Sequence, residues 1–385
     1  MRFLLEHGEH QHRNRGDAAM LMVTAQRLRE MWPQARLDVM TGDPGTLARL
    51  LPDATPVRTA PGGRLSRFRR SGPPPVASVD ALVCVGGGYL TDADPDQTRR
   101  VLGTVLEAQA LGTPVVMFGQ GIGPLDDPEL VELARRALPG VRMIALREGR
   151  EGPAILARLG VPADAVEVTG DDAVRLARAV PAEGPRGAGI GVNHRLAAYL
   201  RTGDRDTELL REAVQAAATR HAAPLVAIPV SEWDDDRPGT ATLTRGFPHV
   251  DEAPAGDADP AWAMRRLDRC RVVVTTTYHL AVFALARGVP VVCGAASEYY
   301  RLKFAGLADL FPGGCRVVAL TAADAGAQLA GAIDEAWRGA PEMAAALQRD
   351  ADRQVALADV AYRRAAALLR TGTPRDAAPH AAAPG

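Results

Sequence analysis

The stretch at residues 271–292 constrains the fold of this chain more than any other. Its apolar, β-branched run at 272–274 predicts a buried strand, and residues 278–287 predict a helix with an apolar face. Gly288 and Pro290 are typical of the point where a helix ends, and a second apolar run follows them. A strand, a helix and another strand in succession form the repeating unit of an open parallel sheet. The stretch therefore predicts an α/β protein.

His279 is the residue of this unit whose presence packing does not explain. It falls in the first turn of the predicted helix, at the carboxyl end of the predicted strand. Ligands of open α/β sheets bind at that edge, and the N-termini of helices attract anions. Thr275, Thr276 and Thr277 come just before it, and any of them is suited to cap the helix. We therefore expect a ligand site beside His279.

Strand, polar turn and helix recur along the chain, and several predicted strands end in groups that suit a ligand. The glycine run at 86–88 lets the backbone approach a neighbour or a ligand, although it matches neither the dinucleotide-binding nor the P-loop fingerprint. Asp171 and Asp172 suit a general base, an acceptor of hydrogen bonds from sugar hydroxyls, or a helix cap. Other polar residues at strand ends are Gln120, Arg147 and Arg195.

A stretch rich in Pro, Gly and Ala at 180–189 divides these repeats into two successive halves. A chain of 385 residues is also too long for one ordinary core. We expect an N-terminal Rossmann-like domain at 1–180, a C-terminal one at 181–370 closed by helices at 322–338 and 340–370, and a disordered tail at 371–385. The predicted fold class is α/β, with two Rossmann-like domains facing across a cleft in a GT-B-like arrangement. The active site is expected in that cleft.

The polar loop after the first predicted strand carries a group of histidines and a short turn. His7, His10 and His12 lack the regular spacing of a metal site, so no metal is expected there. Gly16 permits a tight turn, and Asp17 either caps the following helix or reaches a ligand hydroxyl. Both roles for Asp17 remain open at this point.

Composition argues against several classes of function. The formal net charge of −1 gives no reason to expect nucleic acid or an anionic membrane as a partner. The Arg-rich segment at 64–72 is expected to be a solvated loop, or else a contact for an acidic acceptor or a membrane surface. The sequence has no uninterrupted apolar run of about 18 residues, so no membrane span is expected. The N-terminus lacks a signal-peptide pattern, and we therefore expect a cytoplasmic protein. The four cysteines are far apart, which favours buried free thiols.

Seven short motifs, in their order and spacing, resemble those of the polysaccharide pyruvyl transferase family. They are NRGDAAML at 14–21, VCVGGGYLTD at 83–92, FGQGIGPL at 118–125, ALRE at 145–148, TGDDA at 169–173, YHLAVFALARGVPVV at 278–292 and SEYYRLKFAGLADLF at 297–311. The resemblance covers most of the chain. It implies a GT-B-like fold and an enzyme that moves an enolpyruvyl unit from phosphoenolpyruvate to sugar hydroxyls, which forms a cyclic ketal and releases phosphate.

The resemblance also implies roles for particular residues. By its position His279 inherits the general-acid role, which is to protonate the methylene carbon of the donor. Thr277 stands where the family has an arginine, so Arg195, Arg147 or Arg301 is expected to supply the charge that Thr277 lacks. The residues expected to bind the donor are Arg195, Arg147, Gly87, Gly88, Gln120, Gly121 and Thr277. Asp171 is expected to take part in catalysis, and the acceptor to be bound by Asn14, Asp17 and Tyr299.

Two other functions remain open. A GT-B glycosyltransferase that uses a nucleotide sugar would need a carboxylate to bind the ribose, for which Asp235 and Glu298 are available. A diverged member of the family would carry out a different transfer, or would bind a ligand without turning it over. The leading hypothesis requires no metal and no cofactor, and its partners are a small-molecule donor and a sugar-like or specialised-metabolite acceptor.

Overall fold

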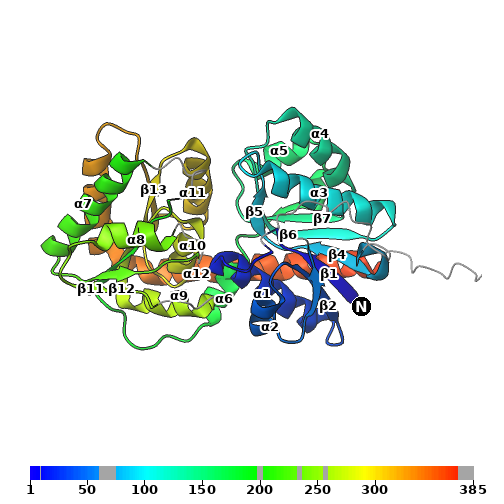
Figure 1. The fold of residues 1–385 in the computed structure, drawn as a ribbon, viewed down its shortest axis with the longest axis horizontal. Coiled ribbons are helices and arrows are strands. Elements are labelled where there is room, and N and C mark those ends of the chain that lie inside the picture. The colour runs from blue at the N-terminus through cyan, green and yellow to red at the C-terminus, as the bar shows by residue number, and fades with distance from the viewer. Residues whose placement is uncertain (9, 60–74, 197–202, 232–235, 255–258, 372–385) are drawn as a thin grey trace, which may run out of the picture.

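The structure is a computed structural model that describes residues 1–8, 10–59, 75–196, 203–231, 236–254 and 259–371. Two α/β bodies lie side by side within this part of the chain, each built around a parallel sheet (Figure 1). The Arg-rich segment at 64–72 and Asp235, for which the sequence suggested roles, lie outside the described residues.

The N-terminal sheet has the strand order β3-β2-β1-β4-β6-β7-β8, and its neighbouring strands are parallel. These strands are β1 (Arg2–Glu6), β2 (Arg36–Thr41), β3 (Thr55–Arg58), β4 (Ala81–Cys84), β6 (Val115–Ile122), β7 (Met143–Leu146) and β8 (Val166–Val168). A short strand, β5 (Gly87–Leu90), pairs with β6 away from this path. The helices between the strands are α1 (Arg15–Met31), α2 (Pro44–Leu50), α3 (Pro95–Ala110), α4 (Pro128–Ala137), α5 (Gly152–Arg158) and α6 (Ala173–Ala179).

The C-terminal sheet has the strand order β11-β10-β9-β12-β13-β14 and is also parallel. Its strands are β9 (Gly189–Asn193), β10 (Leu225–Ala227), β11 (Val250–Asp251), β12 (Cys270–Thr275), β13 (Val291–Ala295) and β14 (Cys315–Ala319). The helices of this half are α7 (Asp204–Arg220), α8 (Asp236–Thr244), α9 (Pro260–Arg266), α10 (Tyr278–Ala286), α11 (Glu298–Leu310) and α12 (Ala325–Thr371).

Each sheet contains a point where the direction of the strand order reverses. This point lies between β1 and β4 in the first sheet and between β9 and β12 in the second. Doubly wound sheets bind their ligands beyond the carboxyl ends of the strands at such a reversal. The predicted α/β class with two Rossmann-like domains is thereby confirmed, and the strand order itself indicates where in each domain a site belongs.

Helix α10 is buried on all sides, although the sequence predicted burial along one face. All of its residues from Tyr278 to Ala286 are buried. It packs against α12 and also against α1 and α6, which belong to the N-terminal half of the chain. A helix that is covered all round must be apolar all round. One continuous core therefore runs from α1 and α6 into the C-terminal body.

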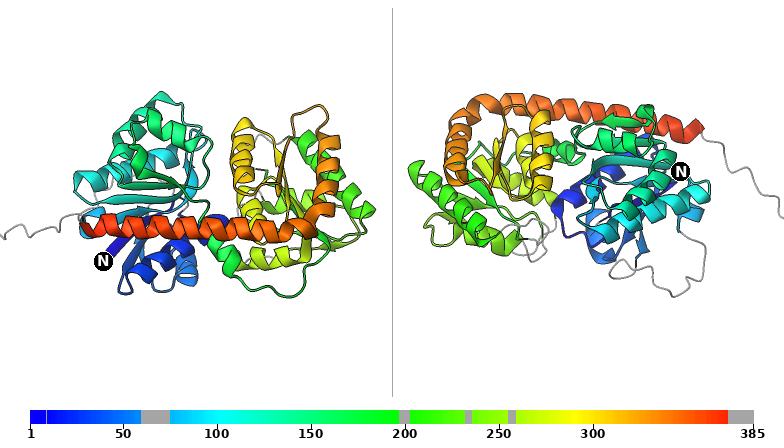
Figure 2. Two further views of the ribbon diagram at one scale, coloured as in Figure 1. Left: turned by 180° about the vertical axis from the view of Figure 1, so that it is seen from behind. Right: turned by 90° about the horizontal axis from the view of Figure 1, so that it is seen from above.

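Helix α12 differs from the prediction of two helices at 322–338 and 340–370. It is one helix from Ala325 to Thr371 with Pro341 inside it, and it crosses both bodies on the face turned toward the viewer in the left view of Figure 2. Proline removes one backbone donor, but packing on both sides of it stabilises the continuous helix. Near its C-terminal end the ring of Tyr362 stacks on that of Phe118 in β6, with centroids 3.7 Å apart. The chain passes from the first sheet to the second between β8 and β9. The exact domain limit at residue 180 stays a prediction.

Two further strands were absent from the prediction. The glycine run at 86–88 was predicted to let the backbone approach a neighbour or a ligand but not to form a strand, and part of it forms β5 because its backbone pairs with β6. The strand β14 lies at the edge of its sheet and is only partly buried, so it lacks the continuous apolar run that revealed the central strands.

The cysteines agree with the prediction of free thiols. Cys84, Cys270 and Cys293 are buried and Cys315 is partly buried, and none forms a disulfide in the described part of the chain. Among the described residues, no helix is both long and apolar enough to cross a membrane.

Candidate active site

The carboxyl edges of the two sheets meet through α1. Asn14 forms an antiparallel bridge with Ser231, and the amide of Arg15 donates to the carbonyl of Val230 at 2.9 Å. Both of these partners follow β10 in the C-terminal half. Gly16 then lies directly against His279, because a Cβ atom built on this glycine would be 2.0 Å from Cγ of the imidazole. The start of α1 is thus fitted into the site where α10 begins.

Asn14, and not Asp17, caps α1. The Asn14 side chain accepts a hydrogen bond from the amide of Gly16 at 2.9 Å, and the helix begins at Arg15. Asp17 lies in the first turn of the helix, where a carboxylate is stabilised by the helix dipole. Its charge acts on Lys303. Of the two roles that the sequence left open for Asp17, capping is therefore wrong.

His279 and Asp171 approach each other from the two halves of the chain. Nε2 of the imidazole lies 3.7 Å from Oδ2 of the carboxylate. Both atoms are buried and lack a hydrogen-bond partner among the described residues. The other oxygen of Asp171 accepts from the amide of Ala173 at 2.9 Å, which orients the carboxylate. Two facing groups with unused hydrogen-bonding capacity suit proton transfer to or from a ligand.

Burial gives this pair unusual acidities. Burial raises the pKa of Asp171 from the ordinary 3.8 to about 6, although the nearby guanidinium of Arg147 acts in the opposite direction. Burial lowers the pKa of His279 well below its ordinary 6.5, and the positive charges of Arg147, Arg195 and Lys303 add to this effect. Without a ligand the imidazole is therefore neutral at pH 7, while Asp171 is close to its titration point.

Arg147 and Lys303 form a cluster of cations against two glycine backbones. A Cβ atom on Gly88 would lie 2.7 Å from Nη2 of Arg147 and 2.7 Å from Nζ of Lys303, and one on Gly121 would lie 2.5 Å from Nε of Arg147. The guanidinium also lies over the ring of Tyr278, 4.2 Å from its centroid. Any larger residue at Gly88 or Gly121 would displace the two cations. These predicted donor-binding glycines thus contact the cations that a donor would meet.

Lys303 is the residue of this cluster that the sequence analysis did not select. Its ammonium donates to the hydroxyl of Tyr299 and lies 3.9 Å from the centroid of that ring, and Tyr299 in turn donates to the carbonyl of Gly88 at 3.4 Å. Burial, followed by the charge of Arg147, lowers the pKa of Lys303 well below its ordinary 10.5. One signal was available, because Lys303 is the only lysine among the 45 lysine and arginine residues of the chain. Lysine adapts its pKa to burial far more readily than arginine, so a lysine suits this buried position.

Arg195 supplies a third cation from the end of β9. Its Nε donates to Oδ1 of Asp236 at 2.5 Å, and its amide donates to the hydroxyl of Thr276 at 3.0 Å. Thr277 is the N-cap residue of α10, but its hydroxyl donates to Oδ1 of Asn193 and does not cap the helix. The side chain of Thr277 is therefore engaged within the protein, and the charge near His279 comes from Arg195, as it does from Arg147 and Lys303.

Several predicted residues are placed differently. The side-chain amide of Gln120 is fully buried and donates to the carbonyls of Phe118, Val85 and Cys84, so it stabilises neighbouring backbone. A Cβ atom on Gly87 would meet the ring of Tyr89, 2.5 Å from its Cδ1 atom, and neither Arg147 nor Lys303 is among its nearest neighbours. Arg301 is exposed and pairs with Glu298, the residue considered for binding a ribose. None of these four residues is part of the cluster formed by Arg147 and Lys303.

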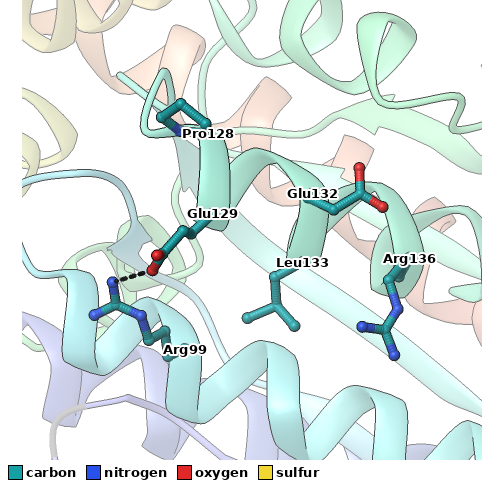
Figure 3. A pocket seen from close by; sticks show the side chains of 6 residues that line it. All are labelled: Arg99, Pro128, Glu129, Glu132, Leu133 and Arg136. Carbon is teal, nitrogen blue, oxygen red and sulfur yellow. Dashed lines mark hydrogen bonds and ion pairs between the residues drawn. The ribbon is translucent and has the colours of Figure 1, made fainter.

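Two other features of the molecule share no residue with this cluster. Glu6 and His10 form a buried hydrogen bond of 2.8 Å, and the ring of His7 stacks on that of His12. No group of three or more potential ligands able to hold a metal ion occurs among the described residues. A hollow on the surface between α3 and α4 shares no residue with the cluster (Figure 3). It is lined by Arg99, Pro128, Glu129, Glu132, Leu133 and Arg136.

Solved structures with the same fold include several nucleotide-sugar enzymes. A putative UDP-N-acetylglucosamine 2-epimerase from Listeria monocytogenes superposes with a TM-score of 0.63 at 13% identity, over 96% of this chain and 95% of that one. The UDP-GlcNAc 2-epimerase from Neisseria meningitidis gives a TM-score of 0.60 at 12% identity, over 96% and 100% of the two chains. A glycosyltransferase from Rickettsia africae gives 0.58 at 10% identity, over 96% and 98%. At these identities the likeness concerns the fold alone, which is of the GT-B type.

Sequence comparison gives a more specific result. No curated protein matches the chain. A family model does match it, and the description of that model is polysaccharide pyruvyl transferase. The match covers residues 14–294, which is more than half of the 385 residues and includes β9, β12 and α10 with His279. The chain therefore belongs to the polysaccharide pyruvyl transferase family and is a transferase.

Proposed function

We propose that the protein transfers a pyruvyl group from phosphoenolpyruvate to two hydroxyls of a sugar or a specialised metabolite. The observation that carries this proposal is the position of the single lysine of the chain, which lies with Arg147 against Gly88 and Gly121. The His279–Asp171 pair adjoins these cations. Phosphoenolpyruvate carries a carboxylate and a phosphate close together, and a cluster of cations beside a proton-transfer pair suits such a donor.

The reaction needs one proton at carbon and two new carbon–oxygen bonds. A proton is added to the methylene carbon C3 of the donor, which makes C2 electrophilic. One acceptor hydroxyl adds to C2 and loses its proton. A second hydroxyl of the same acceptor then forms the second bond to C2 while the C2–O bond to phosphate breaks. Its proton leaves with the phosphate, and the products are a cyclic ketal and inorganic phosphate.

His279 is proposed to deliver the proton to C3. In the ligand-free protein burial and the charges of Arg147, Arg195 and Lys303 keep its pKa low. A donor with several negative charges would neutralise those three cations, so its binding is expected to raise the pKa of His279 toward neutrality. Protonation of the imidazole would then be coupled to the arrival of the donor, and it would not occur in the empty site.

Asp171 is proposed to act beside His279 as the group that accepts a proton from an acceptor hydroxyl. Its pKa of about 6 suits exchange of a proton near neutral pH. Arg147 and Lys303 are proposed to bind the phosphate and the carboxylate, together with Arg195. Asn14, Asp17 and Tyr299 are the residues that we propose for the acceptor. Phosphoenolpyruvate is a cytoplasmic metabolite, so a cytoplasmic location is part of the proposal.

Calorimetry with phosphoenolpyruvate, inorganic phosphate and a set of UDP-sugars tests the donor. At 100 times its dissociation constant the true donor is expected to stabilise the protein by about 2.7 kcal/mol. Lys303→Met is expected to abolish the response to phosphoenolpyruvate, whereas Arg301→Ala, which removes a neighbouring exposed cation, is expected to leave it unchanged. Stabilisation by a UDP-sugar and none by phosphoenolpyruvate would refute the proposal and favour a glycosyltransferase.

Turnover is tested separately by release of phosphate in the presence of a panel of diols. His279→Ala is expected to retain donor binding within a few-fold and to lose phosphate release. Tight binding of phosphoenolpyruvate without phosphate release from any acceptor would instead favour a non-catalytic member of the family.

A further inference from the structure

Asp236 is a buried carboxylate to which the sequence gave no role. It is the first residue of α8 and is fully buried. Its Oδ2 atom accepts three hydrogen bonds, from the amides of Val230 and Ser231, both at 2.9 Å, and from the side chain of Asn193 at 3.1 Å. Three donors on one oxygen fix the orientation of the whole carboxylate. Its other oxygen, Oδ1, then has one defined direction, and it accepts from Nε of Arg195 at 2.5 Å.

The same contact fixes Arg195. A guanidinium is planar, so a bond at Nε sets the plane in which its terminal amino groups lie. The side chain of Arg195 is 10% exposed and that of Asp236 is not exposed at all, so water does not compete for this pair. The amide of Arg195 is held as well, by the hydroxyl of Thr276. Asp236 thus determines where the charge of Arg195 is presented beside His279.

A glycine in α8 allows this helix to pack unusually close to the end of β9. Gly239 lies one turn after Asp236, and a Cβ atom on it would be 2.2 Å from the carbonyl oxygen of His194. Contact that close is possible only for glycine. Asp236 could not reach Arg195 if α8 lay farther from the end of β9. The close approach therefore serves the contact between the carboxylate and the guanidinium.

The charge of Asp236 is maintained by these partners. Burial alone would raise its pKa, but the charge and hydrogen bond of Arg195 and the amides of Ser231 and Val230 together lower it. The carboxylate is therefore ionised at neutral pH. Val230 and Ser231 are also the residues on which Asn14 and Arg15 dock, so Arg195 is held in register with the start of α1.

We infer that Asp236 is a positioning residue for donor binding, which acts by orienting Arg195 toward the donor beside His279. It touches no substrate itself. The inference rests on the proposed function, since it assigns Arg195 to the anionic donor.

A double-mutant cycle on the full chain tests the inference. Asp236→Asn keeps the shape and the hydrogen bonds from Val230 and Ser231 but removes the charge opposite Arg195. The dissociation constant for phosphoenolpyruvate is expected to rise at least tenfold in Asp236→Asn. In the Arg195→Ala background the same substitution is expected to change it less than twofold, because Asp236 acts through Arg195. A merely structural role would give the same effect in both backgrounds and would overturn the inference.

Asp268→Asn is the matched control. Asp268 is a buried carboxylate of the same half of the chain and accepts three hydrogen bonds from Arg287 at 2.6–3.1 Å. Its substitution is expected to affect stability as Asp236→Asn does, while donor binding changes less than twofold. Equal weakening of donor binding by Asp268→Asn would overturn the inference.

Two further arms keep the test decisive. If Asp236→Asn does not fold, Arg195→Lys serves instead, because lysine keeps the charge but has no Nε to be held; binding like that of the wild type would overturn the inference. If wild-type protein does not bind phosphoenolpyruvate, the proposed function fails, and the cycle is measured with inorganic phosphate. Coupling between Asp236 and Arg195 in phosphate binding would then support the role of Asp236, and its absence, or no binding of phosphate, would overturn it.

Discussion

Replacement of Asp171 by asparagine is expected to make the protein more stable at pH 8 and nearly inactive. The carboxylate is buried, and its ordinary pKa of 3.8 rises to about 6 in the folded protein. Each pKa unit corresponds to about 1.4 kcal/mol, so the ionised form costs the fold about 3 kcal/mol relative to the protonated form. Asparagine has nearly the same shape, can keep the hydrogen bond from the amide of Ala173, and carries no charge to bury.

The sign of the effect depends on pH. Between about pH 4 and pH 6 the folded protein holds a proton on Asp171 that the unfolded chain has lost, so wild-type stability falls as the pH rises through this window. The cost is complete above pH 6 and absent below pH 4. The asparagine variant has no such dependence. It is therefore expected to gain up to about 3 kcal/mol over the wild type at pH 8 and nothing at pH 4.

Urea unfolding at pH 4, 6 and 8, together with a phosphate-release assay, measures both consequences. Loss of a proton-transfer group is expected to reduce turnover by about 100-fold or more. Asp236→Asn provides a control of opposite sign: the pKa of this carboxyl is lowered in the fold, so its removal is expected to destabilise the protein at pH 8 and less so as the pH falls. A variant Asp171→Asn that is less stable than the wild type at pH 8, or whose gain is the same at all three pH values, would refute the reasoning.

Gly16→Ala places a methyl group 2.0 Å from ring atoms of His279 and would displace the imidazole. In steady-state kinetics kcat is expected to fall by about tenfold or more, while donor affinity stays within twofold of the wild type. An unchanged kcat would contradict the close fit. Lys303→Met is expected to be at least as thermally stable as the wild type, because an ammonium no longer has to be buried, and a clear loss in a melting experiment would argue against this. Tyr362→Phe removes the hydroxyl that donates to Asp172 at 2.9 Å, and it is expected to lower the free energy of unfolding in urea by about 1 kcal/mol. An unchanged free energy of unfolding would show that this hydrogen bond does not stabilise the protein.

Much of the fold was predictable because it depends on local patterns. Apolar β-branched runs, glycine-rich turns and amphipathic helices repeat along the chain, and parallel sheets follow from that repeat. The same logic placed Arg147, Asp171, Arg195 and His279 at the carboxyl ends of strands, where the structure has them.

The predictions from sequence were wrong where a residue interacts with a distant part of the chain and not with its neighbours in sequence. Thr277 has the residue type and position of a helix cap, yet its hydroxyl donates to Asn193. Gln120 stands between glycines at a strand end, yet its amide serves three carbonyls within the sheet. A break between helices was predicted at residue 339, yet α12 continues through it because it packs on both bodies. In each case a distant partner decided the outcome.

The sequence by itself determined which residues stand at the edges of the two sheets, because strand and turn patterns depend on residues that are close neighbours in the chain. It also marked Lys303, as the single lysine of the chain. Only the tertiary structure decided which of these residues meet: Gly16 against His279, Lys303 against Gly88, and Asp236 against Arg195. Such contacts join segments far apart in the chain, and they depend on how two separately patterned sheets pack around a shared core.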